Sequence, residues 1–135
     1  DGLIKEYSVK CDDRDQPIRM LSGGNIQKVV VARECSLDLD LIIINQPTRG
    51  VDVGAIEFIR KRIVELRDEG KAILLVSADL NEVLELSDSL AVMSEGEVVG
   101  YFEDSSTVTE QELGEYMLGI KRMSKEEAGG VVHEK

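Results

Sequence analysis

The fold is decided by the stretch Leu21-Ser22-Gly23-Gly24-Asn25-Ile26-Gln27-Lys28 and, about one helix later, Leu41-Ile42-Ile43-Ile44-Asn45-Gln46-Pro47-Thr48-Arg49-Gly50-Val51-Asp52. The first segment is a Ser-Gly-Gly turn that opens a helix. Ser22 is expected to cap this helix, because its hydroxyl can accept hydrogen bonds from free amides of the first turn. The second segment is an apolar strand with polar residues at its C-terminal end. Together they indicate a nucleotide-phosphate site.

Helix and strand patterns alternate along the rest of the chain. Apolar residues recur at helical spacing in four segments: 25–35, 53–69, 80–86 and 109–118. Two continuous apolar runs, 39–44 and 72–76, are typical of parallel strands buried on both faces. Residues 89–101 predict a hairpin that turns at Ser94-Glu95-Gly96. The order of these elements predicts an α/β fold with a mostly parallel sheet core.

Composition limits the function classes. The chain has 135 residues, is 42% hydrophobic and carries a net charge of −11, so it predicts one modest core and no nucleic-acid partner. Cys11 and Cys35 lack metal-ligand spacing and are expected to be reduced thiols. The one histidine, His133, lies in a polar tail. No apolar run is long enough to cross a bilayer, so we expect a soluble chain, which leaves docking on a membrane protein open.

A phosphate-gripping loop is missing from this sequence. No Gly-x-x-x-x-Gly-Lys-Ser/Thr motif occurs among the 12 glycines. Nucleotide-binding α/β folds usually begin with a strand and that loop, whereas this chain begins partway through a helical region. We therefore expect a piece of a domain that binds no ATP tightly by itself.

On these residues the sequence resembles the ATP-binding subunits of ABC transporters, over roughly residues 3–119. Residues 21–28 match the signature motif, and residues 41–52 match the Walker B strand and the D-loop. Residues 49–55 are similar to the second ATPase domain of the tandem subunits that serve simple-sugar and nucleoside importers. Residues 56–59 after them, with Gln46 before them, favour the nucleoside branch. The resemblance implies a partial P-loop NTPase (ABC ATPase) fold with flanking helices and a C-terminal β-hairpin. Residues 1–120 would be the C-terminal portion of one ATPase domain, and residues 121–135 a polar tail.

In that family two ATPase domains close head to tail, and each ATP lies between one domain's Walker A loop and the other's signature. The resemblance therefore implies ATP and Mg²⁺ in the full assembly, transmembrane permease subunits as partners, and an extracellular solute-binding protein as an indirect one. It places the protein at the cytoplasmic face of a bacterial-type membrane. Six positions would contact nucleotide or the domain seam: Ser22, Gly23, Gly24, Asn25, Gln27 and Asp52. Asp52 is also expected to be the N-cap of the following helix. For Gln27 and Lys28, the alternative is that they are ordinary exposed residues of a helix.

Three positions depart from the family pattern. Asn45 replaces the aspartate that supports the magnesium shell, Gln46 replaces the glutamate that activates water, and Ala78 replaces the switch histidine. An amide cannot take a proton from water at useful pH. We therefore expect no catalytic residue and no metal ligand in this chain. An engineered Glu-to-Gln trap would explain Gln46 alone, so three changes favour a naturally degenerate site.

Two other readings compete with a transport ATPase. One is an ABC protein that acts on nucleic acids. The acidic net charge and the sequence of residues 49–54 disfavour it. The other is a non-catalytic scaffold module. The sequence does not name the transported solute.

Overall fold

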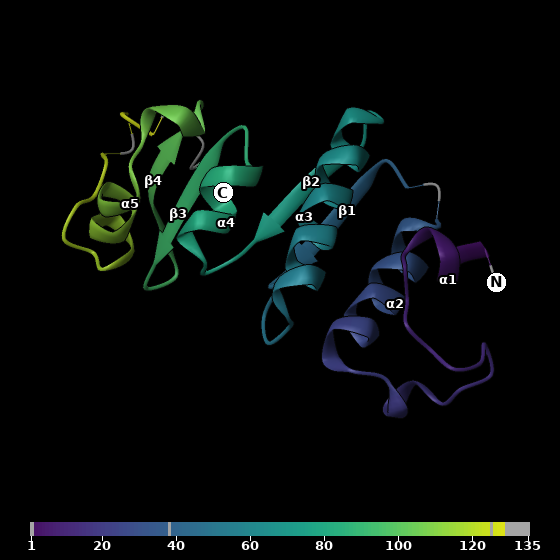
Figure 1. Ribbon diagram of the computed structural model, residues 1–135. Coiled ribbons are helices and arrows are strands. Elements are labelled where there is room, and N and C mark those ends of the chain that lie inside the picture. The colour runs from purple at the N-terminus through teal and green to yellow at the C-terminus, as the bar shows by residue number, and fades with distance from the viewer. Residues whose placement is uncertain (1, 38, 125, 129–135) are drawn as a thin grey trace. The chain divides into compact units, whose positions relative to one another are not determined.

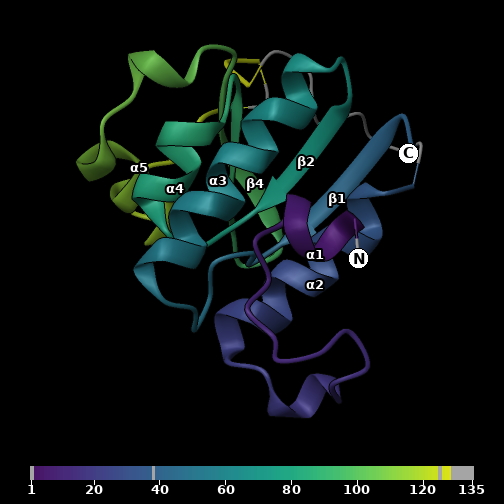
Figure 2. The ribbon, with the colours of Figure 1, turned by 45° about the vertical axis from the view of Figure 1, so that its right-hand side comes forward.

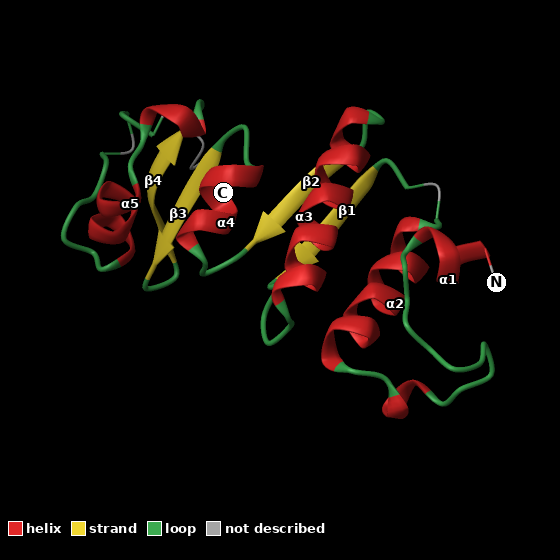
Figure 3. Cartoon of the chain, in the orientation of Figure 1, coloured by secondary structure: helices red, strands yellow, loops and turns green. Residues whose placement is uncertain are grey.

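The computed structural model describes residues 2–37, 39–124 and 126–128 (Figure 1). The chain divides after Val76 into two compact units, Asp1–Val76 and Ser77–Lys135. Each unit contains one two-stranded sheet (Figure 3), parallel in the first and antiparallel in the second. The predicted parallel strands and the predicted hairpin are therefore both present.

The first unit follows the predicted order of elements. Its elements are α1 (Gly2–Glu6), a 3₁₀ turn (Ile18–Met20), α2 (Gly23–Cys35), β1 (Leu41–Asn45), α3 (Val53–Asp68) and β2 (Ala72–Val76). Strands β1 and β2 pair in parallel, from Leu41 with Ala72 to Asn45 with Val76. Helix α3 connects them and lies beside β2 (Figures 1 and 2). Gly70, two residues after α3, has φ +90°, the left-handed conformation that ends helices.

The core of the first unit contains residues from the segment after α1, from α2 and from α3. Tyr7, Val9 and Ala32 are buried together, and Phe58 of α3 packs against them. The rings of Tyr7 and Phe58 meet edge to face at 5.9 Å. Ile59 of α3 is fully buried. The apolar spacing in residues 53–69 therefore has the predicted role.

Two expectations about burial are wrong. The strands are not buried on both faces, because Leu41 and Ile43 are 55% and 66% exposed and Leu74 is 53% exposed. Successive side chains of a strand point to opposite faces of the sheet, and the described residues cover only the face that carries Ile42. The spacing in residues 25–35 predicts Val30 on the apolar side of the helix, but Val30 is exposed, while Val31 packs against the core.

The second unit contains α4 (Leu80–Leu86), β3 (Leu90–Ser94), β4 (Glu97–Phe102), a 3₁₀ turn (Ser105–Thr107) and α5 (Glu110–Met117). Glu95 and Gly96 have φ 53° and 84°, as a two-residue hairpin turn requires. The side chain of Thr109 caps α5 by accepting from the Glu112 backbone amide, at the start of the predicted helical segment 109–118. The core is a single cluster from the hairpin, α5 and the segment before α5: Leu90, Val92, Val99, Val108, Leu113 and Tyr116.

The predicted polar tail is structured where it begins. The Met123 amide donates to the Val99 carbonyl at 2.8 Å, and Ala128 is 3% exposed. Arg122 forms ion pairs with Glu95 and Glu97. His133 lies outside the described residues. None of the helices described is long and apolar enough to cross a membrane.

Candidate nucleotide-binding site

The Ser-Gly-Gly turn forms the N-terminus of α2. Ser22 has extended backbone angles, and its hydroxyl accepts from the Asn25 amide at 3.4 Å, which confirms the predicted cap. The Asn25 side chain donates to the same hydroxyl at 2.9 Å and accepts from the Lys10 amide at 2.8 Å. Asn25 therefore holds the turn against the segment that follows α1.

The two glycines of the turn lie in different surroundings. Gly23 is exposed, and among the described residues beyond its chain neighbours a Cβ added there would meet only the Gly50 carbonyl oxygen, at 3.6 Å. Gly24 is buried, and a Cβ there would come closer than 3.0 Å to Asp52 Oδ2 and to 3.0 Å from Ala55 Cβ. Packing within the chain therefore requires glycine at position 24 but not at position 23.

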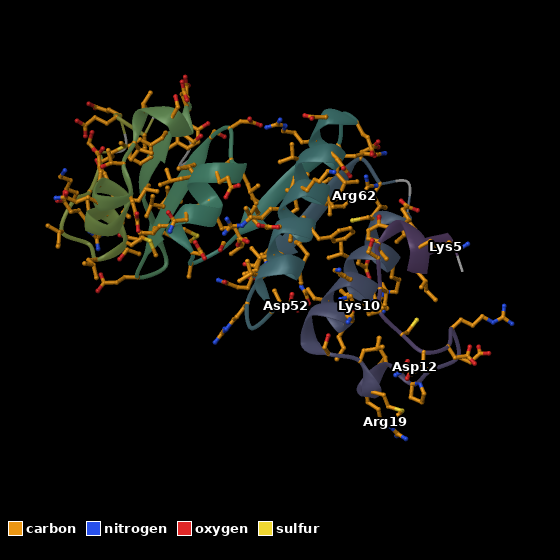
Figure 4. The ribbon with its side chains drawn as sticks, in the orientation of Figure 1. Lys5, Lys10, Asp12, Arg19, Asp52 and Arg62 are labelled. Atoms are coloured by element: carbon orange, nitrogen blue, oxygen red, sulfur yellow. The ribbon has the colours of Figure 1, made fainter. Side chains whose placement is uncertain are left out.

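Asp52 lies at the start of α3 (Figure 4). Its Oδ1 accepts from the Ala55 amide at 3.0 Å, so the predicted N-cap is confirmed. Because its other oxygen faces Gly24, Asp52 brings the start of α3 against the start of α2.

The helix positions after the turn are more enclosed than predicted. Gln27 and Lys28 are half-buried rather than exposed. The Lys28 ammonium lies 4.9 Å from the centre of the Phe58 ring and donates to the Ser8 carbonyl at 3.3 Å. Lys28 is therefore directed at neighbouring elements of its own chain.

The amides Asn45 and Gln46 lie side by side at the C-terminal end of β1. Asn45 is exposed and pairs in register with Val76. The backbone N–H of Gln46 donates to the Val76 carbonyl at 2.8 Å. Gln46 has φ 50°, an uncommon conformation for a residue other than glycine. Ligands of open α/β sheets bind at this end of the strands. Neither residue offers a carboxylate there.

Ala78, the third position that departs from the family pattern, belongs to the second unit and is exposed. The neighbouring Ser77 hydroxyl accepts from the Asp79 amide at 3.1 Å. That hydroxyl therefore serves the turn into α4.

One partly buried polar cluster was not predicted from the sequence. Arg62 Nε of α3 donates to the Tyr7 hydroxyl at 3.2 Å, and Arg62 also pairs with Glu65 and Glu69. Burial raises the pKa of Tyr7 and the pKa of the Cys35 thiol above their ordinary values. Tyr7 and Arg62 are 55 residues apart, so no local pattern indicates their contact. Both cysteines are free thiols.

Comparison with known proteins identifies close relatives. The guanosine import ATP-binding protein NupO of Bacillus subtilis is 48% identical over 129 residues, which cover 96% of this chain and 25% of that protein. The glucose import ATP-binding protein TsgD13 of Haloferax volcanii is 46% identical over 121 residues, 88% of this chain and 22% of that protein. The chain thus spans about a quarter of the length of these relatives. No protein-family model matches it.

Solved structures agree with these relatives. A dimeric bacterial ABC transporter cassette is 25% identical and superposes with a TM-score of 0.65, over 74% of this chain and 43% of that one. The described residues thus form part of an ABC ATPase fold of the P-loop NTPase class. Because NupO, an import ATP-binding protein, is 48% identical over 96% of this chain, and the fold is that of an ABC transporter cassette, this chain belongs to the ABC ATPase family.

Proposed function

We propose that this chain is part of the ATP-binding subunit of an ABC importer, and that its Ser22–Gly23–Gly24 turn completes an ATP site held by a second ATPase domain. The observation that carries this proposal is the exposed start of α2. Ser22 and Gly23 are exposed at the N-terminus of a 13-residue helix. Among the described residues other than the two that flank Gly23, no side chain lies within 4 Å of where a Gly23 Cβ would be. An exposed helix N-terminus without side-chain obstruction favours a phosphate group.

The turn provides the hydrogen-bond donors that ATP needs, whereas the end of β1 lacks the carboxylates that Mg²⁺ favours. The free amides of the first turn and the Ser22 hydroxyl are donors, which a triphosphate needs. By contrast, Asn45 and Gln46 supply neutral amides where a magnesium shell favours carboxylates. When bound in the full assembly, Mg-ATP would supply the bond whose hydrolysis drives transport.

The nucleotide site of this domain itself is proposed to be degenerate. Gln46 can hold a water molecule but cannot deprotonate it, and general-base catalysis contributes about 10²–10⁴ in rate. Asn45 removes one negative charge beside the metal, and Ala78 offers no donor to a phosphate. The partner domain would therefore carry out hydrolysis.

The remaining parts of the proposal concern the assembly. The subunit would bind transmembrane permease subunits at the cytoplasmic face of the membrane, and a solute-binding protein would act with them. A nucleoside is the favoured solute because NupO matches more of the chain than TsgD13 does, and a simple sugar is the alternative. Tandem ATPase domains in one polypeptide remain part of this proposal.

Two substitutions test the role of the turn in the full-length transporter. Ser22→Arg would place a bulky cation where the phosphate approaches the turn and is expected to abolish uptake. Ser22→Thr keeps the hydroxyl and is its conservative control. Gly23→Ala has room within the chain, so a loss of ATP hydrolysis at normal expression and melting temperature would report contact with the partner's nucleotide. Normal uptake and ATPase activity in both Ser22→Arg and Gly23→Ala would refute the proposal.

A further inference from the structure

We propose that Asp52 is a positioning residue that holds the N-terminus of α2 against the start of α3, and so determines where Ser22 and Gly23 are presented. The last step rests on the proposed function. The steric contact itself does not, because it lies entirely within the first unit.

The Asp52 carboxylate is held in place from two sides. Its Oδ1 accepts from the Ala55 amide at 3.0 Å, and its backbone carbonyl accepts from the Ala55 and Ile56 amides, both at 3.0 Å. Its Oδ2 faces Gly24 so closely that a methyl group on Gly24 would overlap it. The side chain therefore cannot move away without losing the cap of α3.

This contact is one of a series between α3 and earlier segments of the first unit. Four residues after Gly24, the Lys28 ammonium lies 4.9 Å from the centre of the Phe58 ring. Further along α3, Arg62 donates to the Tyr7 hydroxyl at 3.2 Å. The Gly24–Asp52 contact is the one in this series that touches the Ser-Gly-Gly turn, so Asp52 is the residue placed to set the position of that turn.

Because Gly24 and Asp52 lie so close together, the effects of substitutions at these two positions should depend on each other. Gly24→Ala overpacks the contact and should displace the start of α2. Asp52→Ser shortens the side chain but keeps a hydroxyl that can cap α3. The combined variant should therefore behave better than Gly24→Ala alone, although Ala55 still limits the space. Gly54→Ala is the matched control, because its Cβ would meet Asp52 Oδ1 at an ordinary 3.5 Å.

The experiment measures melting temperature, and kcat and KM for Mg-ATP, in the full-length transporter. We expect Gly24→Ala to raise KM or lower kcat by about tenfold or more, and Asp52→Ser to restore at least about a third of that loss. Gly54→Ala should resemble the parent.

The outcomes separate this proposal from the proposed function. Additive effects of Gly24→Ala and Asp52→Ser on both melting temperature and ATPase would overturn the contact, whatever the turn does. Rescue of melting temperature without rescue of ATPase constants would overturn the positioning role. If the contact behaves as expected but Ser22→Arg leaves uptake normal, the proposed function fails and the contact stands as a packing feature only.

Discussion

Tyr7→Phe should destabilise the first unit through the loss of a single hydroxyl. Tyr7 is 1% exposed, and its hydroxyl accepts from Arg62 Nε at 3.2 Å. Figure 4 labels Arg62 on α3, and its guanidinium carbon lies 5.8 Å from the centre of the Tyr7 ring. Phenylalanine retains the ring, its edge-to-face contact with Phe58 and most of the cation–π attraction. The variant therefore isolates the hydrogen bond.

The magnitude follows from the surroundings of Arg62. Its side chain is 17% exposed, so water only partly replaces the lost acceptor of Nε–H. A hydrogen bond that involves a charged group contributes about 1.5–3 kcal/mol, and partial hydration reduces this to about 1–2 kcal/mol here. The ion pairs with Glu65 and Glu69 remain and contribute little, because both carboxylates are largely exposed. For a domain of this size, each kcal/mol corresponds to about 4–8 °C in melting temperature.

Differential scanning calorimetry of the whole chain measures this effect. Tyr101→Phe, at a half-exposed position of β4 in the second unit, is the control and should change stability by less than about 0.5 kcal/mol. Arg62→Met should cost more than Tyr7→Phe, because it leaves the buried Tyr7 hydroxyl without its donor. A melting temperature of Tyr7→Phe within about 1 °C of the parent would refute the reasoning that the hydroxyl stabilises this unit.

Three further predictions concern pH, catalysis and binding. The pKa values of Tyr7 and Cys35 are raised in the folded chain, from ordinary values of 10.0 and 9.0, so the folded state holds these protons more tightly. The free energy of unfolding should therefore be unaffected by these groups below about pH 9 and fall as pH rises above it; a urea midpoint that stays constant from about pH 8 to 11 would contradict this. Gln46→Glu alone should leave the degenerate site at background ATPase when the partner site is silenced, whereas its combination with Asn45→Asp and Ala78→His should restore turnover, because groups that act as a unit are not additive. The 135-residue chain should bind Mg-ATP weakly, because loss of about 4 kcal/mol of phosphate-loop contacts costs about a thousandfold in affinity; a micromolar dissociation constant in titration calorimetry would show otherwise.

Local features of the sequence determined the boundaries of the elements. The caps at Ser22, Asp52 and Thr109 lie where their residue types predict, and so does the left-handed Gly70 after α3. A cap or a turn depends on groups within about four residues, so the sequence contains the necessary information. The family motifs at residues 21–28 and 41–52 likewise depend on residue type and spacing alone.

The contacts between distant segments were decided only by the tertiary structure. The pair Gly23–Gly24 reads as two equivalent glycines, and only the approach of Asp52 shows that the second is required for packing. Lys28 reads as an exposed helix residue, and only the placement of α3 directs it at Phe58. The apolar run of β1 indicates burial on both faces, whereas Ile43 is 66% exposed. Burial and close contact depend on which elements pack together, and residues far apart in sequence determine that packing.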